Sequence, residues 1–300
     1  MAIKQLELNL IPQLRKQAVA AKRRVLSRVL EGSWTALLKG RGMEFAGFRQ
    51  YTYGDDASRI DWNATLRTKE VLVREFEEYK TVNVFFVLDL SDSMLFTSQA
   101  KLKCEFAAEL MFNLSTAIVD AGDSVGYVLF SDRIIAKRFP SLGRDVIYRL
   151  AQDLSDGRNY GGKREFKLAM RLVNSLLHQR SLIIIISDFI DLPEGWERYI
   201  KMFSMQYDLI GIMVRDPHDS QLPDLGLQME VQDPSNPQER LLIDAKQYAA
   251  AYAAEVEREE RYVREVFEKA KAGFLRVEPG QETFDILIQY FRRRTSQVKS

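Results

Sequence analysis

Two short apolar runs constrain the fold of this 300-residue chain more than any other feature. Residues 84–88 read Val-Phe-Phe-Val-Leu, and residues 182–186 read Leu followed by four isoleucines. An unbroken apolar run of this length is typical of a strand buried on both faces, as in a parallel sheet. Each run is followed within two residues by an aspartate, Asp89 in the first case and Asp188 in the second.

Strands and helices alternate along the chain from residue 81 onward. Short β-type segments are separated by segments with apolar residues at helical spacing, which predicts an α/β fold with a mostly parallel sheet and helices on both faces. The most apolar segment, 181–187, is expected at the sheet centre, and the tight turn at 131–133 predicts a hairpin at a sheet edge. The expected strands are 82–90, 124–130, 134–139, 181–187, 209–214 and 274–277. The expected helices include 102–119, 195–204, 245–272 and 283–294. A long loop with a short hairpin near 227–231 is expected over 216–240.

The N-terminal part of the chain has a different character. Residues 4–38 show helical spacing of apolar residues, and residues 40–80 combine several glycines with short β-type stretches. We therefore predict an N-terminal helical and small β subdomain over 1–80, and a separate sheet domain over 81–295.

The composition excludes several classes of site. The single cysteine, Cys104, cannot form an internal disulfide, and two histidines far apart in the sequence cannot build a zinc site. A net charge of +1 creates no overall field that would attract nucleic acid. The longest apolar run is too short to span a bilayer, and the first thirty residues lack the apolar core of a signal peptide. We therefore expect a cytoplasmic protein with no transmembrane segment and no nucleic-acid partner.

The acidic ends of the two apolar runs predict a site. Residues 89–93 read Asp-Leu-Ser-Asp-Ser, so a carboxylate and two hydroxyls alternate just beyond the first strand. Ligands of open α/β sheets lie beyond the carboxyl ends of the strands, so Asp89 and Asp188 would face one crevice if their strands are neighbours. Oxygen ligands suit Mg²⁺ or Mn²⁺. The alternative is a polar loop whose side chains cap the next helix.

The Asp-x-Ser-x-Ser pattern of residues 89–93 resembles the signature of von Willebrand factor A-like domains. In that family the motif, a later threonine and a later aspartate form a metal-ion-dependent adhesion site (MIDAS). Asp188 matches the later aspartate, but the Gly-Gly pair that normally precedes the threonine is followed here by Lys163 and Arg164. The resemblance therefore implies a von Willebrand factor A-like fold and an adhesion site without its threonine. The metal ligands that it implies are Asp89, Ser91, Ser93 and Asp188.

The missing threonine leaves two interpretations open. An ammonium or guanidinium group from Lys163 or Arg164 would neutralise Asp89 and Asp188 as a metal would, and would repel a divalent ion. Alternatively, both basic side chains point into solvent, and the site for Mg²⁺ or Mn²⁺ is merely weakened.

A second signature lies in residues 40–67. Its succession of Gly-x-Glu-Phe, Arg-x-Tyr, Gly-Asp-Asp and Arg-x-Ile-Asp-Trp is similar to the bacterial family called domain of unknown function fifty-eight, over roughly residues 25–295. On physical grounds alone, such a density of charged and aromatic residues also predicts either a recognition surface or a buried Arg–Asp network that holds this subdomain against the sheet domain. The signature or interface residues are Glu44, Arg49, Tyr51, Gly54, Asp55, Arg59, Asp61 and Trp62.

The resemblance implies a binding function. Such proteins are commonly encoded beside MoxR-type AAA+ ATPases, which implies a non-enzymatic, chaperone-like adaptor that acts with such an ATPase on a client protein. A-like domains bind proteins through the metal crevice, so a partner carboxylate would pair with Lys163 or Arg164 if either replaces the metal. The alternative is a metal-dependent hydrolase that uses Asp89 and Asp188. No histidine lies near these residues in the sequence, which favours the adaptor.

These interpretations carry an expectation about two substitutions. Asp89→Ala should weaken partner binding more than stability, because the crevice is expected to be exposed. Trp62→Ala should do the reverse if Trp62 packs the N-terminal subdomain, because the loss of a buried tryptophan costs about 3–5 kcal/mol.

Overall fold

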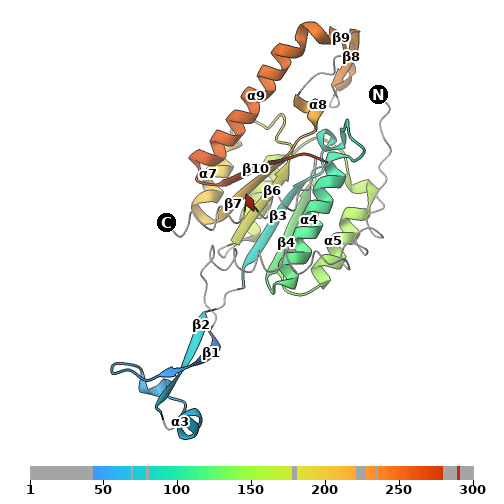
Figure 1. Ribbon diagram of the computed structural model, residues 1–300. Helices are drawn as coiled ribbons and strands as arrows, with labels where there is room; N and C mark the ends of the chain where they lie inside the picture. The colour runs from blue at the N-terminus through green and yellow to red at the C-terminus, as the bar shows by residue number, and fades with distance from the viewer. Residues whose placement is uncertain are drawn as a thin grey trace.

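The computed structural model describes residues 43–68, 70–78, 81–177, 181–220, 228–233, 236–279 and 289–290. Its centre is a six-stranded sheet with the order β10-β7-β6-β3-β4-β5 (Figure 1). Neighbouring strands are parallel except for the antiparallel pair β4–β5 at one edge. This arrangement confirms the predicted von Willebrand factor A-like α/β class and the edge hairpin. The strands are β3 (Asn83–Asp89), β4 (Ser124–Phe130), β5 (Ile134–Ser141), β6 (Ser181–Ser187), β7 (Asp208–Val214) and β10 (Gly273–Val277).

The two apolar runs become adjacent central strands. Strands β3 and β6 pair in register, with Val84 opposite Leu182 and Leu88 opposite Ile186. Both strands are covered on both faces, which is why neither shows polar alternation. The register brings the carboxyl ends of β3 and β6 to the same edge of the sheet.

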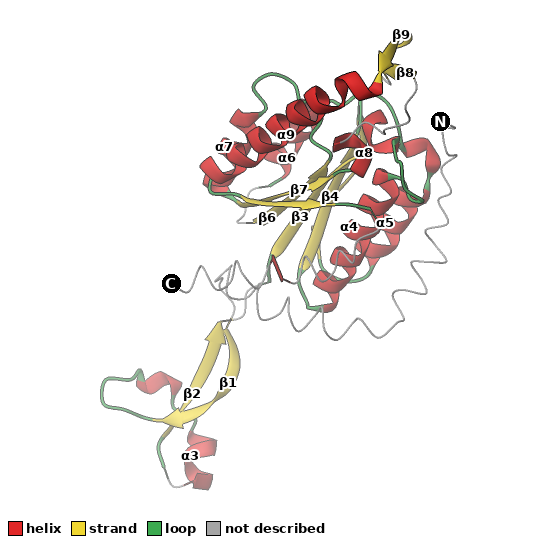
Figure 2. Ribbon diagram, turned by 45° about the horizontal axis from the view of Figure 1, so that its top comes forward, coloured by secondary structure: helices red, strands yellow, loops and turns green. Residues whose placement is uncertain are grey.

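Helices cover both faces of the sheet. Successive strand residues point to opposite faces, so Phe86 packs in the core under α4 and α5 while Phe85 packs in the core under α6, α7 and α9. Figure 2 shows the sheet between these two groups of helices. Their bounds are α4 (Lys103–Asp120), α5 (Asp145–Ser155), α6 (Phe166–Leu176), α7 (Glu197–Gln206) and α9 (Ala245–Lys269).

The thiol of Cys104 provides a test of the packing beneath α4. Its side chain is buried, and burial raises the pKa of the thiol to about 12. Because the thiolate is the reactive form, we expect the native protein to resist a thiol-specific disulfide reagent at pH 8 and to react fully in denaturant. A rapid stoichiometric reaction of the native protein would contradict this packing.

The signature region folds as a separate antiparallel hairpin with short helical turns. Strand β1 (Met43–Gln50) pairs with β2 (Leu72–Glu78), and the connection contains η1 (Ala57–Arg59) and α3 (Trp62–Thr68). Figures 1 and 2 show this hairpin projecting away from the central sheet.

The charged residues of this hairpin pair at its surface. Arg49 Nη1 lies 2.6 Å from Asp55 Oδ2, and Arg74 Nε lies 2.8 Å from Asp61 Oδ2, with both arginine side chains about half exposed. The prediction of a buried Arg–Asp network is therefore wrong. The prediction that Trp62 is packed inside is wrong as well, because its side chain is 65% exposed. A short helix such as α3 has too little partner surface here to cover an indole.

A hairpin lies within the predicted loop over 216–240. Strand β8 (Gln228–Asp233) pairs with β9 (Asn236–Asp244), which confirms the short hairpin predicted near 227–231 and extends it to residue 244. Another short helix, α8 (Pro217–Ser220), follows β7. The predicted helix at 4–38, and most of that at 283–294, lie outside the described residues. Within the described residues, no helix combines the length and apolar character needed to cross a bilayer.

Candidate functional site

The candidate site lies where the two central strands end. Asp89 is the last residue of β3, and Asp188 directly follows β6. The chain leaves β3 toward α4 on one face and leaves β6 toward α7 on the other. Such a change of direction creates the crevice in which open α/β sheets place their ligands. The structure thus brings the two predicted carboxylates together.

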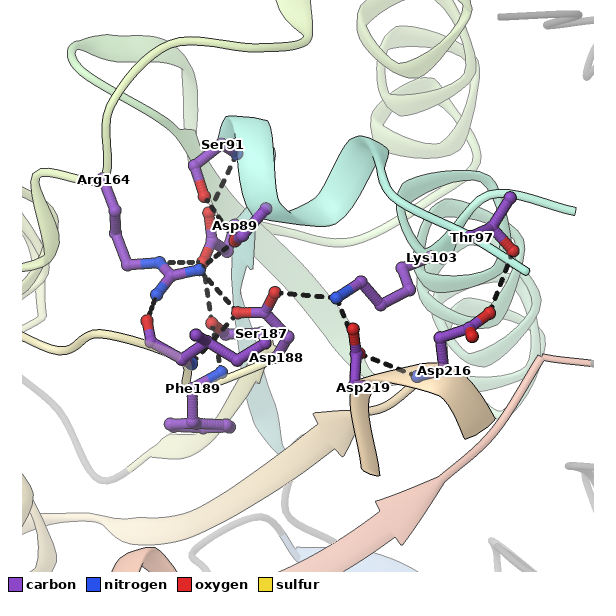
Figure 3. A network of polar contacts seen from close by, with 12 residues as sticks. Asp89, Ser91, Thr97, Lys103, Arg164, Ser187, Asp188, Phe189, Asp216 and Asp219 are labelled. Carbon is purple, nitrogen blue, oxygen red and sulfur yellow. Dashed lines mark hydrogen bonds and ion pairs between the residues drawn. The ribbon is translucent and has the colours of Figure 1, made fainter. Parts of the chain in front are cut away.

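The guanidinium of Arg164 lies between these carboxylates (Figure 3). Its Nε is 2.6 Å from Asp89 Oδ2, and its Nη2 is 2.5 Å from Asp188 Oδ1. It also donates to the Ser93 hydroxyl through Nη2 and to the Ile190 carbonyl through Nη1. The Arg164 side chain is 7% exposed, and both carboxylates are fully buried.

Two glycines set the path of the backbone that places Arg164 in this position. Gly161 and Gly162 have φ angles of +95° and +94°, a region that side chains rarely tolerate. The Gly161 amide donates to the Leu90 carbonyl at 2.8 Å, and the Gly162 amide donates to Asp92 Oδ1 at 2.8 Å. The loop before Arg164 is therefore fastened to the loop after β3, which fixes where the arginine enters the crevice.

Local hydrogen bonds orient Asp89. Its Oδ1 accepts from the Ser91 amide at 2.9 Å, and its Oδ2 accepts from the Ser187 hydroxyl at 2.7 Å in addition to Arg164. The Ser91 and Ser93 hydroxyls lie 3.4 Å apart. The predicted residues 89, 91, 93 and 188 thus meet as a group, and the group is organised around a guanidinium.

A second buried cation, Lys103 of α4, adjoins the site. Its Nζ lies 3.1 Å from Asp188 Oδ2 and 2.8 Å from Asp219 Oδ2, and its side chain is 1% exposed. The sequence reasoning missed Lys103 and Asp219. A signal for Lys103 existed, because it lies three residues before Phe106 and seven before Leu110 on the apolar stripe of the helix. No comparable signal marks Asp219.

Opposite charges at the site stabilise the ionised forms of their neighbours. Burial alone would raise the pKa of Asp188, but the positive charges of Lys103 and Arg164 outweigh it and hold this pKa below its ordinary value. Burial opposes the charged form of Arg164 as well, yet Asp89 and Asp188 raise its pKa above the usual value for arginine. Both shifts favour the ionised forms of Asp188 and Arg164.

The cluster of acidic and basic residues continues to α8. Asp219 Oδ2 also accepts from the Asp216 amide at 2.9 Å. The Asp216 carboxylate, which is fully buried, accepts from the Thr97 hydroxyl at 3.1 Å and from the Ser98 amide at 2.8 Å. Burial alone would raise the pKa of Asp216, but its hydrogen bonds lower it overall. The loop after β3 is thereby joined to the end of β7.

The divalent cation implied by the family resemblance does not fit these residues as arranged. The oxygens that would bind it, from Asp89, Ser93 and Asp188, are the acceptors of Arg164. A second positive charge, on Lys103, already contacts Asp188. Because the side chain of Lys163 is exposed, Arg164 and not Lys163 is the basic residue in the crevice.

The complete burial of Asp89 also corrects an expectation about mutations. The premise that Asp89 lies in an exposed crevice is wrong, because the crevice is filled by Arg164. Exposed positions next to the site include Phe96, which is 40% exposed with its ring 5.9 Å from Lys103 Nζ, and two neighbours in sequence of the site residues, Lys163 and Asp191. We call these three residues the rim.

The signature residues gather on the β1–β2 hairpin and not at the crevice (Figure 1). Arg49 and the Thr52 amide lower the pKa of Asp55 below its ordinary value, and Gly54 supplies the positive φ angle of +107° for the intervening turn. Asp61 caps the following helix through the Ala64 amide at 3.0 Å. The Tyr51 side chain is half-buried and that of Arg59 is exposed, whereas the side chain of Glu44 lies outside the described part.

The chain is similar to proteins of several bacteria. A family model described as "Protein of unknown function DUF58" matches residues 47–264. Uncharacterized proteins of Mycobacterium tuberculosis and Mycobacterium bovis are 26% identical over 203 residues, which is 67% of this chain and 64% of theirs. The chain thus spans less than two thirds of the length of these relatives.

Solved structures give more distant similarities. The conserved hypothetical protein BatB from Bacteroides thetaiotaomicron is 18% identical, with 72% of this chain and 99% of that chain covered and a TM-score of 0.45. An aerotolerance-related membrane protein from Bacteroides fragilis is 19% identical, with 71% and 99% covered and a TM-score of 0.45. A von Willebrand factor type A protein from Catenulispora acidiphila is 13% identical, with 49% and 36% covered and a TM-score of 0.35.

Proposed function

This chain belongs to the DUF58 family of proteins of unknown function, and from that premise we propose that it is a non-enzymatic adaptor that docks other proteins at the crevice between β3 and β6. The observation that carries the proposal is the ion-paired crevice itself. A set of buried charges costs desolvation free energy unless the pairs are complete, so an arrangement of the loops that completes every pair is favoured over one that breaks a pair. Here it fixes three loops at a sheet edge where ligands bind.

The rim supplies a surface for such docking. Phe96 offers an exposed aromatic ring, and Lys163 and Asp191 add one charge of each sign. Aromatic residues surrounded by polar groups are frequent anchors of protein interfaces. The three rim residues come from three different loops, so the buried charges beneath them set their relative positions.

A hydrolase is supported less well by this geometry. A catalytic carboxylate must be within reach of the substrate or of a water molecule and free to accept a proton. Asp89 and Asp188 are fully buried, and both are paired with Arg164. The arrangement of these groups favours a scaffold for binding over proton transfer.

We further propose a MoxR-type AAA+ ATPase as the docking partner, with a client protein that the pair assembles or matures. This step rests on the family resemblance. The single buried thiol of Cys104, which has no cysteine to pair with, agrees with a reducing compartment, so the cytoplasm is the proposed location.

The adaptor proposal is tested with the full chain and the MoxR-type ATPase of the same organism. We expect a complex on co-purification and a change in ATP turnover when this protein is added. Phe96→Ala should weaken the complex about tenfold, as is typical when an interface anchor is removed.

The matched control is Phe139→Ala, which removes a 62% exposed phenylalanine from the edge strand β5 and should leave binding unchanged. Thermal melts of both variants show whether the fold is retained. If no complex forms and ATP turnover stays the same, the proposed partner is wrong. Equal weakening by both substitutions would show that the crevice is not the docking surface.

A further inference from the structure

We propose that Arg164 is the resident cation of this crevice, and that the site works without a divalent metal ion. The part of this inference that concerns docking rests on the proposed function. The part that concerns the cation rests on the contacts of the crevice alone.

Arg164 contacts oxygens that the family resemblance assigns to a metal ion. Its guanidinium binds Asp89 Oδ2, Asp188 Oδ1 and the Ser93 hydroxyl, which come from both strand ends. A hard divalent cation would select the same oxygens. A planar guanidinium with five N–H donors can satisfy several acceptors at once, and it remains charged at every accessible pH.

The carboxylates that a metal ion would need are already paired with cations. The buried carboxylates of Asp89, Asp188 and Asp219 face the two buried cations Arg164 and Lys103. A divalent ion added to this cluster would have both cations as close neighbours and would find its acidic ligands already paired. Repulsion at such distances is strong because buried charges are poorly screened.

The chain on both sides of Arg164 holds the guanidinium in this place. Gly161 and Gly162 adopt positive φ angles, and a side chain on Gly162 would approach Asp132 Cγ within 2.9 Å. After the arginine, the Glu165 amide donates to the Ser131 carbonyl at 2.8 Å. The segment is thus fixed on both sides of Arg164, which keeps the guanidinium from leaving easily for solvent.

The inference changes what a partner would recognise. An adhesion site with a metal offers an open coordination position to an acidic group of the partner. Arg164 is only 7% exposed, and its donors are directed to acceptors of this chain. A partner therefore contacts the rim of Phe96, Lys163 and Asp191, and a partner carboxylate does not complete the site.

The test measures Mn²⁺ binding by titration calorimetry and by electron paramagnetic resonance, using the full chain without the ATPase. The wild-type protein should show no binding below about 1 mM Mn²⁺, and its melting temperature should be the same in EDTA. Arg164→Thr removes the internal cation and supplies a hydroxyl ligand, so this variant should bind Mn²⁺ at least tenfold more tightly and melt at a higher temperature when Mn²⁺ is present.

Lys163→Thr is the matched control and should behave as the wild type, because its side chain is exposed. Micromolar Mn²⁺ binding by the wild type would overturn the inference, and so would a folded Arg164→Thr protein that fails to gain binding. If Arg164→Thr does not fold, the wild-type titration decides alone. Because the ATPase is absent, the result is independent of whether the adaptor function is correct.

Discussion

Asp89→Ala is expected to lower the free energy of unfolding by about 3–5 kcal/mol, the usual cost of breaking a buried ion pair by removing one partner. The carboxylate is fully buried, it binds Arg164 Nε at 2.6 Å, and it accepts from the Ser187 hydroxyl at 2.7 Å. Its removal leaves these two donors short of an acceptor in a place that water does not reach. Urea unfolding followed by circular dichroism measures the effect.

Two controls separate this effect from a general sensitivity to substitution. Asp132→Ala removes a carboxylate that is 46% exposed, pairs with the neighbouring Arg133 and accepts from the Ser131 hydroxyl at 3.0 Å, and it should cost less than about 1 kcal/mol. Trp62→Ala, at an indole that is 65% exposed, should change stability by about 0.5 kcal/mol or less. An Asp89→Ala variant as stable as these controls would show that the crevice is open to solvent.

The sheet could be predicted from the sequence because its strongest signals are local. Two continuous apolar runs cannot be exposed on either face, so residues 84–88 and 182–186 had to become central strands. The aspartates at their ends followed from the same pattern. Strand β9 was missed because its residues Asn236–Asp244 begin with polar side chains and a proline, and its pairing with β8 is what makes it a strand.

The site was only partly predictable, for reasons of geometry. Lys163 and Arg164 are adjacent in sequence, and no periodic pattern distinguishes which of them enters the crevice. The positive φ angles of Gly161 and Gly162 set the direction of the following chain, so Arg164 is buried and Lys163 is exposed. Trp62 shows a second reason why prediction failed. Its place in a signature motif gives no information about burial, and the indole is exposed.

Lys103→Met is expected to cost about 3–5 kcal/mol in the free energy of unfolding at pH 7. Methionine fills a similar volume but leaves Asp188 and Asp219, both buried, without the ammonium that lies 3.1 Å and 2.8 Å from them. Lys101→Met is the matched control two residues earlier. Its ammonium lies 2.6 Å from Glu109, but the side chain is 40% exposed, so the expected cost is about 0–1 kcal/mol.

The pH dependence of Lys103→Met tests the cause of this loss. In the wild type, the lowered pKa of Asp188 contributes stability that is fully present above its unfolded pKa of about 3.9 and is lost as pH falls toward the folded value. Without Lys103, only Arg164 opposes the effect of burial on Asp188, so the pKa of this carboxyl rises and acid removes part of the excess negative charge. The difference in unfolding free energy between the two proteins should therefore shrink as pH falls from about 5 to about 3. A difference that stays constant over this range would mean that lost packing, and not lost charge pairing, destabilises the variant.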